Sequence, residues 1–152
     1  NDYLHKSSRY VVDYLVDNDI GHLVIGKNDQ WKSKISIGKR NNQTFVNIPH
    51  SRLIDMIKYK YESIGGKVRL TEESYTSKAS FFSKDILKKG VFSGKRVKRG
   101  LYRDSVCGTI NADVNGSLNI LRKVVKEPFG DLIEDKQFIQ YCRTPVLCNI
   151  NE

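Results

Sequence analysis

The sequence lacks a long hydrophobic run. None of its apolar stretches approaches the ~20 residues that a membrane-spanning helix needs, and its start shows no secretory signal pattern. We therefore expect no membrane segment and a cytoplasmic location. The chain also starts without an initiator methionine, so we expect its 152 residues to be part of something longer.

Cysteine is scarce as well. The chain has three, Cys107, Cys142 and Cys148, and they form neither a CxxC pair nor a Cys/His spacing typical of a zinc site. An odd number without a secretion signal predicts reduced thiols rather than a disulfide framework. The three histidines have no partner at the spacing of a metal ligand or a catalytic base, and we interpret them as structural.

Acidic residues are nearly absent from one stretch of the chain. Between Lys84 and Arg103, eight basic residues stand against the single acid Asp85, within a chain of formal net charge +9. This density is typical of a surface that binds phosphate backbones, although a solvated basic loop without a special role has a similar composition. The residues expected to bind nucleic acid are Lys95, Arg96, Lys98, Arg99 and Arg103.

The only tryptophan, Trp31, stands among polar and charged neighbours. In that setting its indole ring is a candidate for stacking on a nucleic-acid base. The more common role for such a ring is to pack on the domain surface. Both readings stay open at this point.

What the sequence does have is the periodicity of an α/β protein. Apolar spacing predicts a helix over residues 4–17, a buried strand over 20–25, a helix starting at Pro49, and a strand over 67–73. A helix after the basic stretch completes the order. The layout is typical of a βαβ unit with parallel strands. Because two strands are too few to cover three helices, we expect further strands upstream.

The last predicted helix begins after Asn111, a good N-cap residue. Its apolar face is expected to consist of Val114, Leu118, Leu121 and Val125. Asp113 then falls in the first turn, where backbone N–H groups favour an ionised carboxylate. Such a carboxylate suits a divalent metal, and the alternative is an ordinary first-turn acid.

Two further acids, Glu72 and Glu73, end the second predicted strand. The carboxyl end of a strand is the usual place for chemistry in an α/β sheet. Neighbouring residues of a strand point to opposite faces, so one of the two at most can face a given site. The alternative is a solvated strand end.

Several short motifs occur together in one order. They are Tyr3-Leu-His-Lys-Ser-Ser-Arg, Asn47-Ile-Pro-His, Glu73-Ser-Tyr-Thr-Ser-Lys-Ala-Ser, Phe92-Ser-Gly-Lys-Arg, Arg99-Gly-Leu-Tyr-Arg and Asn111-Ala-Asp-Val-Asn-Gly. This combination resembles the C-terminal half of TnpB (OrfB), the transposase-associated protein of bacterial insertion sequences. The resemblance covers roughly residues 2–126. It implies a partial RNase H-like (RuvC-type) fold that lacks the first strands and is related to the nuclease domain of type V CRISPR effectors.

The resemblance also implies an RNA-guided DNA endonuclease that uses Mg²⁺ or Mn²⁺. Such a site needs three carboxylates that hold two metal ions about 4 Å apart. Asp113 matches the third acid of the family, and the second falls on Gly26 here. Some branches of the family carry that acid before the Tyr-Thr-Ser motif instead, which points to Glu73 or else Glu72.

The first carboxylate has no counterpart in the chain, so the resemblance implies that an upstream segment or a partner chain completes the site. The family's inserted zinc ribbon usually carries two CxxC pairs. Here residues 79–82 occupy one of those places and Cys107 stands alone near the other, so we expect no zinc. The nuclease region is expected over residues 1–125, with the basic insertion at about 76–110 and a C-terminal tail over 126–152.

Two functions remain from the sequence. The first is a fragment of a transposon-associated, RNA-guided DNA endonuclease, with DNA and a guide RNA as partners. The alternative is a catalytically incomplete remnant that binds nucleic acid without cutting it.

Overall fold

The structure is a computed structural model that describes residues 2–27 and 40–144, with the backbone alone for residues 40–48. The chain divides into two compact units. Of the described residues, unit 1 comprises 2–25 and 40–70, and unit 2 comprises 26–27 and 71–144. Trp31 lies outside the described residues, so its predicted role stays a prediction.

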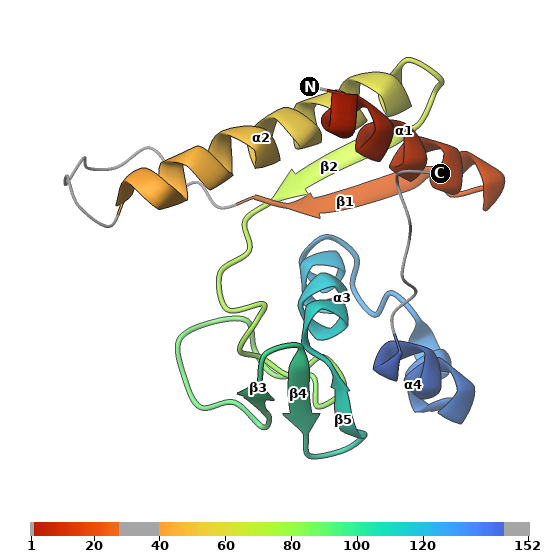
Figure 1. Ribbon diagram of the computed structural model, residues 1–152. Coiled ribbons are helices and arrows are strands. Elements are labelled where there is room, and N and C mark those ends of the chain that lie inside the picture. Colours follow the sequence, from red (N-terminus) through yellow and green to blue (C-terminus); the bar gives the residue numbers. More distant parts are fainter. Residues whose placement is uncertain (1, 28–39, 145–152) are drawn as a thin grey trace. The chain divides into compact units, whose positions relative to one another are not determined.

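Unit 1 is built from two helices and two strands (Figure 1). Helix α1 (Asp2–Asp17) packs on α2 (Arg40–Glu62), and strands β1 (His22–Gly26) and β2 (Lys67–Thr71) form a two-stranded sheet. The strands run parallel, and α2 connects them. The core consists of Val12, Leu15 and Tyr61, with Leu23 and Val68 against it. The predicted βαβ order and the mixed α/β class are therefore confirmed.

One boundary in unit 1 was predicted wrongly. Pro49 lies inside α2, which begins at Arg40, and does not open the helix. Proline removes one backbone hydrogen bond and favours the first turn, but neither effect prevents a helix from extending upstream of it.

Unit 2 contains a three-stranded antiparallel sheet in the order β3-β4-β5. Its strands are β3 (Lys95–Lys98), β4 (Leu101–Asp104) and β5 (Gly108–Asn111). Helix α3 (Ala112–Val124) follows β5 directly, and the 3₁₀ turn η2 (Gly130–Glu134) and α4 (Lys136–Arg143) come after it. Strands β4 and β5 form an antiparallel hairpin, and β3 pairs with β4 to extend it.

The core of unit 2 is aromatic. Phe81 and Phe82 meet edge to face with ring centroids 5.4 Å apart, beside the wholly buried Tyr102. Phe129 and Phe138, from the segment after α3, pack against this cluster with their own centroids 4.8 Å apart. The segment after α3, which the sequence analysis treats only as a tail, therefore packs on the core of unit 2.

Candidate nuclease and nucleic-acid-binding site

The start of α3 places Asp113 as the sequence predicts. The Asn111 side-chain oxygen accepts hydrogen bonds from the backbone N–H groups of Asp113 (2.9 Å) and Val114 (3.0 Å), which caps the helix. The Asp113 carboxylate is 87% exposed. It forms a long ion pair with Arg96, in which 3.8 Å separates Oδ1 of Asp113 from the guanidinium nitrogen. This carboxylate is free to accept another ligand.

Glu72, in contrast, is held by protein groups. Lys123 of α3 donates to its carboxylate, and the Ser74 backbone N–H donates to the other oxygen at 2.8 Å. The hydrogen bond from Lys123 and those from Ser74 lower the pKa of Glu72 to about 2. The Lys123 side chain is only 10% exposed, so this ion pair holds Glu72 against α3 within unit 2.

Glu73 is half-buried and turns toward the end of β1. A side-chain carbon built on Gly26 would lie 3.2 Å from Oε2 of Glu73 and 2.6 Å from Cδ1 of Ile120 on α3. The Glu73 carboxylate therefore stands beside the position from which a residue-26 side chain would project. The predicted strand over 67–73 is too long by two residues: β2 ends at Thr71, so Glu72 and Glu73 follow the strand, and their carboxylates have different neighbours.

Asp113 and Ile120 lie on the same side of α3, because seven positions along the helix are about two turns, or roughly 10 Å along the axis. Gly116 lies between them, and a side-chain carbon added there would meet nothing within 4 Å. This side of α3 is therefore open at Gly116. Across the described residues, however, no group of three or more His, Cys, Asp or Glu is arranged to hold a metal ion.

Two buried asparagines fix α3 in place, and the sequence analysis missed them. Asn119 donates to the backbone oxygens of Thr76 (2.9 Å) and Ala79 (2.8 Å), and Asn115 donates to that of Ala79 at 2.9 Å. Asn115 also accepts from the Phe81 N–H at 3.1 Å. Both side chains are 0% exposed. The buried face of α3 therefore centres on Asn115, Leu118 and Asn119, while the predicted Val125 is exposed.

The five basic residues expected to bind nucleic acid lie on β3, β4 and the turn between them, and all five are exposed. Lys95 stands directly opposite Arg103 across the strands. Like charges in that arrangement repel each other and destabilise a sheet. A basic pair at this position is therefore suited to binding anionic groups that neutralise the two charges.

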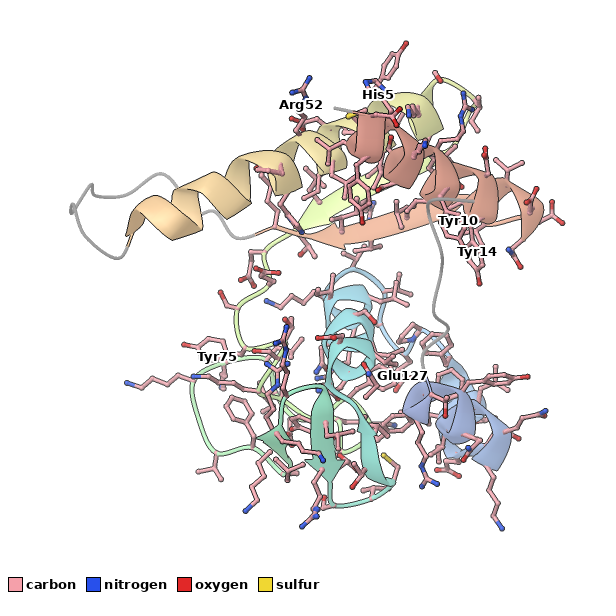
Figure 2. The ribbon with its side chains drawn as sticks, in the orientation of Figure 1. His5, Tyr10, Tyr14, Arg52, Tyr75 and Glu127 are labelled. Carbon is pink, nitrogen blue, oxygen red and sulfur yellow. The ribbon has the colours of Figure 1, made fainter. Side chains whose placement is uncertain are left out.

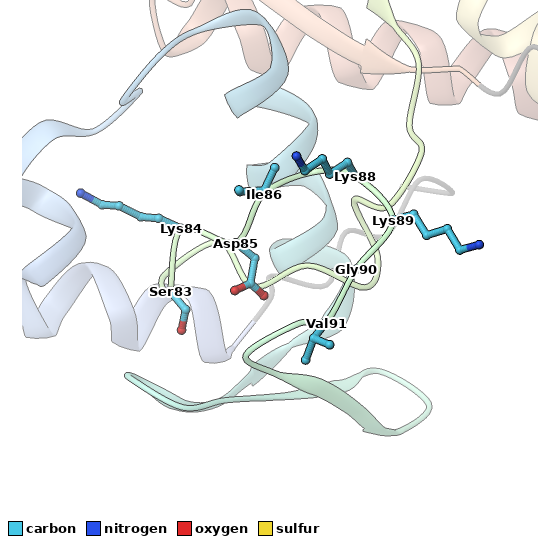
Figure 3. Close-up of a pocket in the computed structure, with 8 residues that line it drawn as sticks. All are labelled: Ser83, Lys84, Asp85, Ile86, Lys88, Lys89, Gly90 and Val91. Carbon is cyan, nitrogen blue, oxygen red and sulfur yellow. The ribbon is translucent and has the colours of Figure 1, made fainter.

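The basic strand and the helix acid meet at Arg96, which pairs with Asp113. On the same unit, the loop before β3 lines an open pocket with Lys84, Lys88 and Lys89 (Figure 3). Unit 2 also contains an aromatic pair, Tyr75 and Phe92, whose ring centroids are 6.4 Å apart; Tyr75 is labelled in Figure 2. Cationic groups and aromatic rings thus occur together on unit 2.

Cys107 and Cys142 are buried free thiols. Burial, followed by the negative charge of Asp104, raises the pKa of Cys107 to about 12, so this thiol is protonated at neutral pH. Within the described residues, no helix is long and apolar enough to cross a bilayer.

One protein-family model matches this chain. It is the Cas12f1-like TNB domain, which aligns with residues 50–120. The match spans the end of α2, the whole basic insertion, Glu72, Glu73 and Asp113. No curated protein matches the sequence. The match covers slightly less than half of the chain, and over this stretch the chain is similar to a Cas12f1-like TNB domain.

Proposed function

We propose that the chain is the C-terminal part of the RuvC-type nuclease region of a TnpB-like, RNA-guided DNA endonuclease. Asp113 and Glu73 supply two of its three metal-binding carboxylates. The third comes from a segment outside the described residues or from a partner chain. Lys95, Arg96, Lys98, Arg99 and Arg103 contact the nucleic-acid backbone.

The position of Glu73 carries this proposal. The resemblance expects a glutamate at residue 26, and a glycine stands there. In the structure the Glu73 carboxylate lies 3.2 Å from the place where the missing side chain would begin. Neighbouring parallel strands lie only about 4.8 Å apart, so an acid just after the end of one strand can take the place of an acid at the end of the other. The ion pair to Lys123 leaves Glu72 unsuited to the same role.

The chemistry of these acids fits magnesium. Carboxylate oxygens are the ligands that Mg²⁺ and Mn²⁺ prefer, and Asp113 is exposed and free to bind. Bound Mg²⁺ would lower the pKa of an attacking water and stabilise the leaving oxygen of the phosphodiester. Asn115 and Asn119 hold the backbone of α3 rigid, which fixes where the Asp113 carboxylate points.

The basic sheet supplies attraction to phosphates rather than recognition of bases. Lys95 and Arg103 lie side by side across two strands, where each positive charge can pair with a phosphate of the backbone. Arg96 is close enough to Asp113 to hold a phosphate next to the metal site. Sequence specificity then comes from base pairing with a guide RNA.

The test is Mg²⁺-dependent cleavage by the chain expressed together with the coding sequence that precedes it. We expect Asp113→Ala and Glu73→Gln each to lower the cleavage rate by at least about 100-fold, because each removes a metal ligand. Asp131→Ala is the matched control, since Asp131 is an exposed acid in the first turn of η2. It should cleave at the parental rate.

Glu72→Gln separates the two assignments for the strand acid. We expect it to retain cleavage, because the Glu72 carboxylate is already bound to Lys123. Loss of cleavage in Glu72→Gln but not in Glu73→Gln would transfer the role to Glu72. Cleavage that survives Asp113→Ala would leave the alternative function, a nucleic-acid-binding remnant, as the better description of this chain.

A further inference from the structure

Two short turns of unit 2 face each other around one buried carboxylate. The first turn contains Ser80 and Ser83, and the second contains Asp104 and Cys107. In each turn two residues separate the pair. The Ser80 hydroxyl donates to Oδ2 of Asp104, and the Ser83 hydroxyl donates to the same oxygen at 3.1 Å.

The other oxygen of Asp104 binds its own turn. Its Oδ1 accepts from the backbone N–H of Val106 at 2.6 Å and from that of Cys107 at 2.8 Å. A carboxylate offers about four acceptor positions, and these four donors fill them. Burial opposes the charge on Asp104, but the hydrogen bonds outweigh it and lower the pKa of this carboxyl group. At neutral pH the centre of the cluster is a satisfied anion.

Two facing turns, each with a pair of residues at x₂ spacing, are the arrangement that holds a structural zinc ion in zinc ribbons. The sequence analysis put the first pair at residues 79–82, and the structure moves it by one residue to Ser80 and Ser83. The donors present do not fit zinc. They are two hydroxyls, one saturated carboxylate and one protonated thiol, whereas structural zinc requires four thiolate or imidazole ligands.

We propose that the Asp104 carboxylate takes the place of a metal ion between these two turns, so that unit 2 folds around a hydrogen-bonded anion and needs no zinc. The carboxylate joins the two turns as a metal ion would, because it binds one turn through Oδ1 and the other through Oδ2. Asp104 ends β4 directly after Arg103, so this cluster also fixes the strand that carries the basic pair. The inference is independent of the nuclease proposal, because its test reads zinc content and stability.

The first measurement is made on the parental 152-residue protein. We expect zinc far below one atom per chain by elemental analysis, and an unfolding temperature that a strong chelator leaves unchanged. Asp104→Ala should lower the unfolding temperature, since it strips two buried hydroxyls and two N–H groups of their acceptor. Asp131→Ala, an exposed acid of the same unit, should not. Stoichiometric zinc whose removal unfolds the protein would overturn the proposal, as would an unchanged Asp104→Ala variant.

The second measurement uses a variant in which the hydrogen-bonded cluster is replaced by four potential zinc ligands. The triple variant Ser80→Cys, Ser83→Cys, Asp104→Cys places three thiols beside Cys107. We expect it to acquire about one zinc per chain and to become sensitive to chelators, as a Cys₄ ribbon would. The matched control adds Cys107→Ser and should bind zinc at least 10-fold more weakly. A folded triple variant without zinc would show that the turns are not equivalent to a metal-binding pair and would contradict the proposal.

Discussion

Glu72 and Glu73 are neighbours in the sequence, yet their carboxylates have different partners. Lys123 binds the first, and the second faces Gly26 and Ile120. The alternation of a strand end predicts that the two differ, but periodicity does not say which neighbour each will meet. That depends on α3, which lies far along the chain and contributes both Lys123 and Ile120.

The Glu72–Lys123 pair predicts a pH-dependent stability. The pKa of Glu72 in the folded protein is about 2, below its ordinary value of 4.5. The pair therefore stabilises the fold above about pH 4.5, and its contribution is lost as the pH falls toward 2. Because the Glu72 side chain is 54% exposed, solvent screening reduces the gain.

The measurement compares the unfolding temperatures of parental protein and Glu72→Gln at about pH 6 and about pH 3. We expect Glu72→Gln to be less stable at the higher pH and the difference to shrink at the lower one. In a Lys123→Met background the same substitution should have little effect at either pH, since the partner is gone. A difference that persists unchanged at low pH would mean that the carboxylate is not paired.

At the scale of elements, the sequence predicted the regular parts of the fold and missed the buried polar ones. Periodicity located α1, β1 and β2 to within a few residues, and the Asn111 cap marked the start of α3. Asn115 and Asn119 were missed, because asparagine counts as a surface residue and their partners are backbone oxygens in a distant loop. The i, i+4 spacing of the two amides around Leu118 was the available signal.

The site was predictable to the same degree. Asp113 stands where its cap and helix turn place it, since both depend on residues next to it. The gathering of serines and Asp104 was not predictable, because it joins residues 24 positions apart through a fold that no local pattern specifies. Cysteines at the same spacing would have indicated two facing turns in the sequence, whereas serine and aspartate at that spacing are not a recognised signal.

The cross-strand pair on β3 and β4 predicts a particular salt dependence. If Lys95 and Arg103 each neutralise a phosphate, the double variant Lys95→Ala/Arg103→Ala should reduce the slope of log affinity against log salt. The expected change is about 0.9 per phosphate on duplex DNA, or roughly 2 for the pair. Lys136→Ala, a single exposed cation on α4, is the control and should leave the slope unchanged. A filter-binding or fluorescence titration at several salt concentrations measures it, and an affinity insensitive to salt would exclude a phosphate-binding role for this face.

At the scale of the whole molecule, binding and cleavage have different requirements. The charge needed for binding is within the chain, which has a net charge of +9 and five exposed basic residues on or beside β3 and β4. The proposed cleavage site needs three carboxylates, and the described residues hold no group of three His, Cys, Asp or Glu arranged to bind a metal ion.

The two activities should therefore separate. We expect the 152-residue chain alone to bind nucleic acid but not to cut it in Mg²⁺, and the chain joined to its preceding coding sequence to do both. Removing Mg²⁺ with a chelator should abolish cleavage by the longer protein while its binding persists, since the basic sheet needs no divalent metal to attract phosphates. Cleavage by the isolated chain that Asp113→Ala abolishes would show that the site is complete without a further carboxylate, and the proposed three-acid arrangement would then be wrong.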